Sequence, residues 1–99
     1  MALIQRPAQA GTLESSDILI MIAPGEPGKG IVISLESPVQ KQFGRRITSI
    51  VTRHLQQADI QDAEVHIQDR GALDYAIEAR IETAIARATA PADKEPGNA

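Results

Sequence analysis

The chain has 99 residues, which suits one small domain, and 42% of them are hydrophobic. Cysteine is absent and Phe43 and Tyr75 are the only aromatic residues, so the core must be aliphatic, and disulfides and zinc–thiolate sites are excluded. The net charge is −3, with no basic block and no series of aromatic residues, which argues against a nucleic-acid partner. The longest apolar run, residues 18–23, is too short to span a bilayer and no secretory signal precedes it, so we expect a cytoplasmic protein without a membrane partner.

The N-terminal half is predicted to contain two strands. Residues 1–11 are expected to be an irregular lead-in and the polar residues 12–17 an exposed loop. Residues 18–23 are apolar throughout, which is typical of a strand covered on both faces. A loop rich in Pro and Gly at residues 24–30 leads to a second strand at residues 31–36. The loop is short, so we expect the two strands to pair as an antiparallel hairpin.

The C-terminal half is predicted to contain two helices and a third strand. Ser37 is expected to cap the first helix and Pro38 to occupy its first position. This helix should extend to about Ala58, because apolar residues recur at three- and four-residue spacing: Val39, Phe43, Ile47, Ile50, Val51 and Leu55. Alternating apolar residues predict a strand at residues 63–68, and a second helical repeat predicts a helix at roughly residues 72–88.

The element order β-β-α-β-α predicts an α+β fold, a small two-layer sandwich in which a three-stranded sheet carries both helices on one face. Residues 1–90 form the predicted domain, and residues 91–99, rich in Pro, Gly and charge, are expected to be a disordered C-terminal tail. The first strand is apolar on both faces, so its outer face should leave an apolar spot. Either the N-terminal segment or a partner subunit is expected to cover it.

Few residues suggest catalysis. His54 falls near the apolar face of the first helix and His66 on the polar face of a strand, and neither has a second His or Cys at metal-ligand spacing. We interpret both as structural or solvated and expect no metal site. Gly25, Gly28 and Gly30 precede a strand, whereas a phosphate-binding loop opens onto a helix, so these glycines are interpreted as turn residues.

Three carboxylates, Asp74, Glu78 and Glu82, recur every fourth residue along the second predicted helix. General acid–base catalysis needs carboxylates whose environments separate their pKa values. These three are expected to lie together on a solvated stripe, with Arg80 and Arg87 beside them. The sequence therefore predicts no catalytic residue.

The polar segment at residues 12–17 precedes the strongest predicted strand and contains adjacent hydroxyls at Ser15 and Ser16. An exposed hydroxyl on a short loop, braced by a rigid strand, is a good acceptor for covalent modification. The same residues are also ordinary turn formers, whose side chains hydrogen-bond to nearby backbone. From the residues alone both interpretations stay open, and so does a non-catalytic α+β interaction domain.

Four segments resemble one protein family. A-G-T-L-E-S-S-D at residues 10–17, followed by I-A-P, resembles the N-terminal region of the citrate lyase acyl carrier protein, the gamma subunit. V-Q-K-Q-F-G at residues 39–44 resembles the start of that family's helix, and G-A-L-D at residues 71–74 and A-R-I-E at residues 79–82 resemble its C-terminal helix. The order and spacing of these motifs agree over nearly the whole chain before the tail.

The resemblance implies a modified serine. The serine of G-T-L-E-S matches Ser15, which is expected to carry 2'-(5''-phosphoribosyl)-3'-dephospho-CoA, covalently attached through a phosphodiester by a dedicated prosthetic-group transferase that releases pyrophosphate. Ser16 stands where the family commonly has glycine or another small residue, and it is the less favoured acceptor.

The resemblance also implies a role and partners. The thiol of the group would hold acetyl and citryl thioesters, exchanged by the alpha subunit (CoA-transferase) and cleaved by the beta subunit (citryl lyase), so that citrate yields acetate and oxaloacetate in citrate fermentation. The chain itself is expected to be a non-catalytic carrier subunit. The alternative within the same chemistry is the acyl carrier subunit of malonate decarboxylase.

Overall fold

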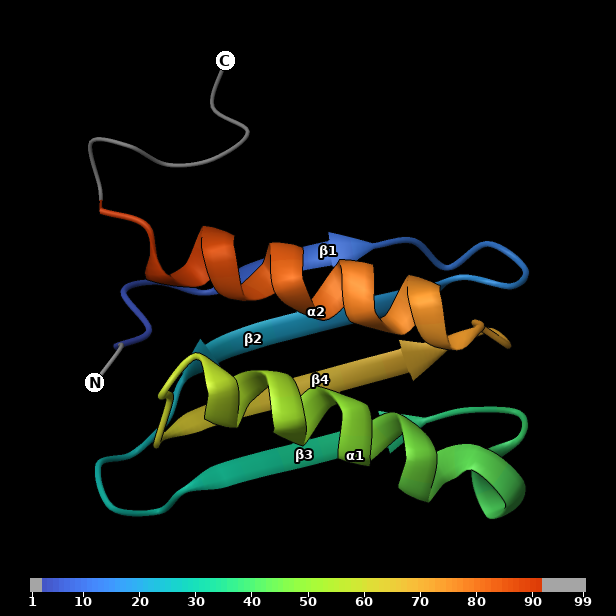
Figure 1. Ribbon diagram of the computed structural model, residues 1–99, viewed down its shortest axis with the longest axis horizontal. Helices are drawn as coiled ribbons and strands as arrows, with labels where there is room; N and C mark the ends of the chain where they lie inside the picture. Colours follow the sequence, from blue (N-terminus) through green and yellow to red (C-terminus); the bar gives the residue numbers. More distant parts are fainter. Residues whose placement is uncertain (1–2, 92–99) are drawn as a thin grey trace.

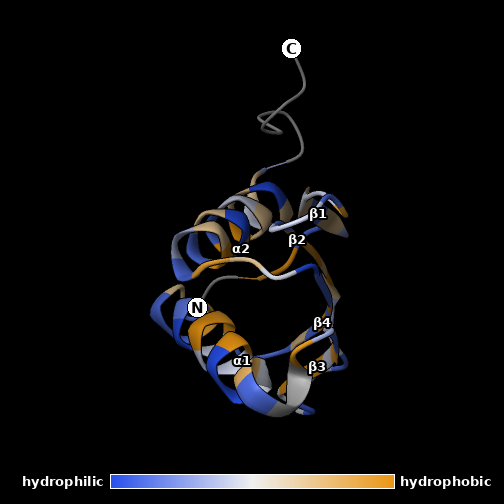
Figure 2. Cartoon of the chain, turned by 90° about the vertical axis from the view of Figure 1, so that its right-hand side faces the viewer, coloured by the Kyte–Doolittle hydropathy of each residue, from blue (hydrophilic) through white to orange (hydrophobic). Residues whose placement is uncertain are grey.

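The computed structural model describes residues 3–91, in which a four-stranded sheet forms one layer and two helices form the other. Both helices cover the same face of the sheet, as predicted (Figures 1 and 2). The elements are, in chain order, β1 (Ala8–Gly11), β2 (Ile18–Pro24), β3 (Ile31–Glu36), α1 (Gln40–Gln57), β4 (Ala63–Asp69) and α2 (Asp74–Thr89). Of the predicted tail, residues 92–99 lie outside the described residues. No helix within residues 3–91 is long and apolar enough to cross a membrane.

The sheet has the strand order β1-β2-β4-β3, which corrects two predictions. The predicted three-stranded sheet is wrong, because β1 adds a fourth strand antiparallel to β2. The predicted hairpin of β2 and β3 is also wrong, because β4 lies between them, antiparallel to β2 and parallel to β3. The β3–α1–β4 segment is therefore a crossover unit, and the loop between β2 and β3 spans the width of one intervening strand.

The core lies between the layers and is aliphatic, as the composition requires. Its fully buried large side chains come from both layers: Ile18, Ile20, Ile22, Val51, Leu55, Val65, Ile67, Ile77 and Ile81. Burial of each such side chain contributes roughly 1.5–3 kcal/mol. Neither aromatic side chain belongs to this set, since Phe43 is 48% exposed and Tyr75 is 72% exposed.

The outer face of β2 carries Leu19, Met21 and Ala23, which are half-buried. Residues 3–11 border this face along one edge. Gln5 N–H donates to the carbonyl of Ala88 at 2.7 Å, which places the lead-in beside α2, and β1 then pairs along the edge of β2. Pro7 and Gln9 line a hollow with Met21 and Ala23, so the N-terminal segment covers the face only in part, and coverage by a partner subunit stays a prediction.

The connection from β3 to α1 also differs from the prediction. The helix begins at Gln40, and no side chain caps it. The Ser37 hydroxyl accepts the Val39 N–H at 3.1 Å and donates to Asp69 Oδ2 at 2.8 Å. Asp69 is 2% exposed, and its other oxygen accepts the Ala72 N–H at 2.9 Å. Ser37 thus ties the β3–α1 connection to the β4–α2 connection instead of capping a helix.

Candidate attachment site

The hydroxyl-rich loop, residues 12–17, joins β1 to β2 at the end of the molecule where β4 ends and α2 begins (Figure 1). It leaves β1 through Gly11, whose φ is +102°. A Cβ at this position would lie 1.8 Å from the carbonyl oxygen of Ile18. Only glycine avoids both the left-handed strain and this overlap, so Gly11 allows the loop to close directly onto β2.

Asp17 organises the loop from its C-terminal end. Its Oδ2 accepts hydrogen bonds from Thr12 Oγ1 at 2.6 Å and from Arg80 Nη2 at 2.8 Å. Its Oδ1 accepts from the Ile18 N–H at 2.8 Å and from Arg80 Nε at 3.1 Å. The guanidinium of Arg80 therefore binds the carboxylate in the bidentate manner, which is geometrically specific. Because Arg80 lies on α2, this pair fixes the loop relative to the helix layer.

The same contacts set the charge state of the pair. The hydrogen bonds from Arg80 and then Thr12 hold the pKa of the Asp17 carboxyl well below its usual range, although partial desolvation opposes them. The hydrogen bond to Asp17 in turn raises the pKa of Arg80. The carboxylate side chain is 15% exposed and the guanidinium 39% exposed, so solvent screens the pair only in part.

The centre of the loop is a tight turn over residues 14–17. Asp17 N–H donates to the carbonyl of Glu14 at 3.1 Å, and the central residues are Ser15 and Ser16. Ser16 has φ +64°, whereas Ser15 has a negative φ, which is the pattern of a type II turn that favours glycine at its second central position. Ser16 N–H also donates to the carbonyl of Arg70 at 2.8 Å, so the turn is tied to the end of β4.

Ser15 therefore stands at the first central position of an anchored turn. Ser15 and Ser16 are both exposed, and neither hydroxyl hydrogen-bonds to another group of residues 3–91. A hydroxyl without an internal partner can react without breaking a contact that the fold needs. The backbone at Ser16 is constrained by its φ and by Arg70, whereas Ser15 is exposed and no hydrogen bond within residues 3–91 holds it. This arrangement suits attachment of a group to Ser15 and offers no base to a reaction.

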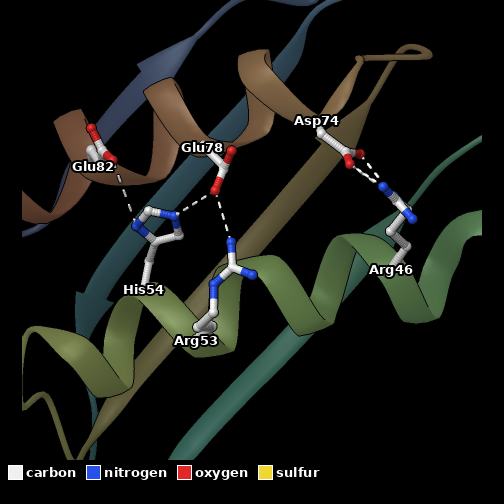
Figure 3. A network of polar contacts seen from close by, with 6 residues as sticks. All are labelled: Arg46, Arg53, His54, Asp74, Glu78 and Glu82. Carbon is white, nitrogen blue, oxygen red and sulfur yellow. Dashed lines mark hydrogen bonds and ion pairs between the residues drawn. The ribbon is translucent and has the colours of Figure 1, made fainter.

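The titratable residues considered as catalytic candidates lie elsewhere, between the two helices (Figure 3). Glu78 Oε1 accepts from Arg53 Nη2 at 2.7 Å and lies 3.4 Å from His54 Nε2. His54 Nδ1 lies 3.9 Å from Glu82 Oε1. A second pair, Arg46 and Asp74, joins the second turn of α1 to the first turn of α2, and its hydrogen bonds lower the pKa of Asp74 and raise that of Arg46.

The predicted neighbours of these carboxylates are thus wrong in part. Asp74, Glu78 and Glu82 share one stripe, but the stripe faces α1, and its partners are Arg46, Arg53 and His54. Arg80 binds Asp17, and Arg87 Nη1 donates to the carbonyl of Gln9 at 2.9 Å. The network connects two helices.

Chemistry other than attachment has little support in residues 3–91. No group of three or more His, Asp or Glu side chains there is arranged to hold a metal ion. The side chain of His66 is exposed on the open face of the sheet, with Met21 opposite it on β2. Neither histidine hydrogen-bonds to Ser15 or Ser16 among the described residues, so no nucleophile–base pair is formed.

Comparison with known proteins decides the family. The family model described as malonate decarboxylase delta subunit (MdcD) matches residues 5–88. The citrate lyase acyl carrier protein of Halothermothrix orenii is 45% identical over 91 residues, which cover 92% of this chain and 95% of that protein. The citrate lyase acyl carrier protein of Lactiplantibacillus plantarum is 52% identical over 85 residues, covering 86% of each chain. This chain belongs to the citrate lyase acyl carrier protein family.

One further relative supports this membership, and one solved structure shares the fold. The citrate lyase acyl carrier protein of Vibrio cholerae is 47% identical over 85 residues, covering 86% of each chain. The fold resembles a chain in the crystal structure of a Pseudomonas malonate decarboxylase hetero-tetramer in complex with malonate, with a TM-score of 0.70 and 22% identity over 85% of this chain and 84% of that one. The chain is accordingly a carrier subunit and not a catalytic one, as expected from the resemblance.

Arg80 is the residue of the site that the sequence did not identify. It was expected beside the carboxylates of its own helix, yet it reaches the loop and binds Asp17. A signal was present, because Asp17 and Arg80 both fall in segments that resemble the family, the first at residues 10–17 and the second at residues 79–82. Sequence alone could not show that the two segments meet.

Proposed function

We propose that Ser15 carries 2'-(5''-phosphoribosyl)-3'-dephospho-CoA through a phosphodiester and that the chain acts as the acyl carrier of citrate lyase. When bound, the group supplies a terminal thiol that holds acetyl and citryl groups as thioesters. A thiol must be supplied in this way, because the chain has no cysteine. The observation that carries the proposal is the exposed, unpaired Ser15 hydroxyl on a turn held by Asp17, Arg80 and Arg70.

In the attachment reaction, the role of this chain is to hold the Ser15 hydroxyl in place. The Ser15 Oγ forms the new bond to phosphorus of the triphosphoribosyl precursor, the bond from that phosphorus to pyrophosphate breaks, and the hydroxyl proton leaves to a base of the transferase. The Ser15 hydroxyl donates a hydrogen bond to no group of residues 3–91, so we assign the base to the transferase. After attachment the loop stays fixed to β4 and α2 through Ser16 and Asp17. A tethered group reaches an effective concentration of about 1 mM for a short flexible linker.

Intact mass spectrometry tests the acceptor. The chain is coexpressed with the prosthetic-group transferase and the enzyme that makes its precursor, and it is compared with Ser15→Ala and Ser16→Gly. We expect a mass gain in the unsubstituted chain and in Ser16→Gly, and none in Ser15→Ala. Ser16→Gly is the matched control because glycine tolerates the positive φ of Ser16, whereas alanine there would strain the turn.

Two outcomes contradict this assignment. A mass gain in Ser15→Ala that disappears in Ser16→Gly moves the attachment to Ser16. No gain in the unsubstituted chain, under conditions in which a known citrate lyase carrier is modified, leaves a non-catalytic interaction domain as the function. Circular dichroism of each variant confirms that the fold is retained before the masses are compared.

The partners belong to the same proposal: the citrate lyase alpha subunit, which is a CoA-transferase, the beta subunit, which is a citryl lyase, and the prosthetic-group transferase, all in the cytoplasm. Relatives at 43–52% identity are named citrate lyase acyl carrier proteins, which favours this complex. The family model and the 22% identical structure favour malonate decarboxylase as the second candidate. Mixing the modified carrier with the catalytic subunits of each enzyme discriminates between them, and turnover of malonate but not citrate would reverse our choice.

A further inference from the structure

Both aromatic residues of the chain are exposed, which is unusual because aromatic side chains normally supply much of a core. Phe43 lies in the first turn of α1, and Tyr75 lies in the first turn of α2. Leu73, directly before α2, is 62% exposed. Leu13 is 49% exposed and belongs to the hydroxyl-rich loop at residues 12–17, here called the attachment loop. These four are among only six exposed large hydrophobic residues in the described part of the chain.

An apolar groove runs between the starts of the two helices. Its apolar lining consists of Val39, Phe43, Ile47, Ala72, Leu73 and Ile77. The outer parts of this lining, Phe43 and Leu73, are the exposed ones, whereas Ile47 and Ile77 at its base are buried. The groove is therefore continuous with the core below it and open to a partner above.

The groove lies beside the attachment loop. Ser16 N–H donates to the carbonyl of Arg70 at 2.8 Å, and the next two residues, Gly71 and Ala72, line the groove. The segment from Arg70 to Leu73 spans three residue steps, which is at most about 11 Å of extended chain. The attachment loop, the β4–α2 connection and the start of α1 are found at the same end of the molecule (Figure 1).

The rim of the groove carries one positive charge without a partner. Two arginines, Arg45 and Arg46, and two aspartates, Asp69 and Asp74, line the groove, so its lining has no net charge. Arg46 pairs with Asp74 across it. Arg45 is exposed and has no ion-pair partner among residues 3–91, which leaves a positive charge at the rim.

We propose that Phe43, Leu73 and Tyr75, with the groove that Phe43 and Leu73 line, form the docking surface for the catalytic subunits that act on the group carried by Ser15. The complementary surface has an apolar centre and an acidic residue facing Arg45. The identity of these subunits rests on the proposed function. Interfaces place aromatic and aliphatic anchors in their centre and charges at the rim, which is the arrangement seen here.

A protein surface fits this end better than the attached group itself. Tyr75 and Leu13 do not line the groove, so a ligand inside it would leave them exposed, whereas a protein that covers the end of the molecule buries all four hydrophobic residues. A subunit docked beside Ser15, and not on it, also leaves the tethered thioester free to reach an active site. The body of the carrier supplies the binding energy in this arrangement, with or without the group.

The test measures binding of the full chain to purified, assembled citrate lyase alpha and beta subunits by isothermal titration calorimetry, once with the unmodified and once with the modified carrier. The variants are Leu73→Ser and Tyr75→Ser. The matched control is Leu3→Ser, because Leu3 is 62% exposed like Leu73 but belongs to the N-terminal lead-in beside the C-terminal end of α2. We expect Kd to rise about 10-fold or more for each variant, in both forms of the carrier, and to change less than about 2-fold for Leu3→Ser.

The charge of Arg45 provides an independent test of the same surface. Arg45→Glu should weaken binding at low salt, and the difference from the unsubstituted chain should shrink as salt rises, because an exposed ion pair is screened. The same variants are checked for prosthetic-group attachment by intact mass. Unchanged attachment with weakened subunit binding supports the docking surface. Failed attachment at Ser15 in the unsubstituted chain overturns the proposed function while leaving the binding of the unmodified carrier interpretable.

Several results would overturn the docking surface. If Leu73→Ser, Tyr75→Ser and Leu3→Ser bind the catalytic subunits with equal affinity, this surface does not dock them. Effects confined to the modified carrier assign the groove to the attached group. Effects on attachment without effects on subunit binding assign the surface to the transferase. Loss of a self-associated species in sedimentation, with subunit binding unchanged, assigns it to a second copy of the chain.

Discussion

Two connections of the sheet are each organised by one aspartate, with different consequences. In the attachment loop at residues 12–17, Asp17 binds the guanidinium of Arg80 on α2 through two hydrogen bonds, of 2.8 and 3.1 Å. The β2–β3 loop is held from outside by Asp62, which belongs to the α1–β4 connection. Its Oδ1 accepts backbone N–H groups, from Gly28 at 3.1 Å and from Gly30 at 2.9 Å. The first aspartate joins its own loop to the helix layer, and the second joins the β2–β3 loop to the connection that leads into β4.

The glycines with positive φ differ between the two loops. Gly11, Gly28 and Gly30 all have positive φ. A Cβ on Gly11 would overlap the backbone of Ile18, whereas a Cβ on Gly28 or Gly30 would meet nothing within 4 Å. The close approach of the β2–β3 loop lies at Gly25, where a Cβ would lie 2.6 Å from the backbone nitrogen of Ala63. Gly11 thus combines a positive φ and a close approach in one residue, whereas the β2–β3 loop divides the two between different glycines.

The largest effect is expected at Gly11. Gly11→Ala should lower the free energy of unfolding by about 3 kcal/mol or more, because backbone strain and a steric overlap with Ile18 act together. Gly30→Ala should cost about 1 kcal/mol from φ alone. Urea unfolding followed by circular dichroism measures both. Similar costs at the two positions would show that β1 shifts to accommodate the new methyl group and that the close approach is not required.

The next largest effect is expected when Asp17 loses its partner Arg80, compared with the loss of Asp62 from the other connection. Arg80→Met should lower the free energy of unfolding by about 1–2 kcal/mol, since Asp17 stays charged while losing its main partner. It should also slow prosthetic-group transfer to Ser15 about 10-fold, because a displaced reacting group loses rate steeply. The rate is followed by intact mass over time with purified transferase.

Asp62→Ala is the control for that comparison. It should cost about 1 kcal/mol through the lost backbone hydrogen bonds and leave the rate of transfer to Ser15 unchanged. If the two variants slow transfer equally, the rate reports overall stability and Arg80 does not position the loop.

A pH dependence follows from the depressed pKa of Asp17. The folded-state pKa lies below the value of about 3.9 for an unfolded chain, so the contribution of Asp17 to stability is complete above roughly pH 5. It is lost as the pH falls toward the folded-state pKa. The free energy of unfolding of the unsubstituted chain should therefore fall more between pH 5 and pH 2, both approximate bounds, than that of Asp17→Asn. Parallel curves for the two proteins in urea titrations would contradict the assignment of this titration to Asp17.

The sequence predicted the elements better than it predicted their arrangement. Both helices and the strands β3 and β4 follow from hydrophobic periodicity, because each buries one face, and β2 follows from its continuous apolar run. Strand β1 was missed because its four residues, A-Q-A-G, carry no alternating large hydrophobic side chains, and pairing with β2 stabilises it instead. The insertion of β4 between β2 and β3 was missed because both alternatives bury the same apolar residues, and only long-range pairing separates them.

The candidate site divides in a similar way. Ser15 is predicted from the resemblance of residues 10–17 to the family and stays a prediction, whereas the exposed loop before a buried strand follows from local sequence information. The contacts that hold the loop are not local, because Arg80 is 63 residues away from Asp17 in the chain. The stripe of Asp74, Glu78 and Glu82 was visible in the sequence, but its partners on α1 depend on which face of α2 meets that helix.

The smallest effect is expected at Ser16, and it bears directly on the choice of acceptor. Ser16→Gly should leave the free energy of unfolding unchanged or raise it by up to about 1 kcal/mol. Glycine adopts φ +64° without strain, and its greater flexibility in the unfolded chain offsets part of this gain. The turn, the N–H donated to Arg70 and the position of Ser15 are all retained. Chemical unfolding measures the first quantity and intact mass the attachment. A loss of stability greater than about 1 kcal/mol would mean that the Ser16 side chain has a structural role in the turn.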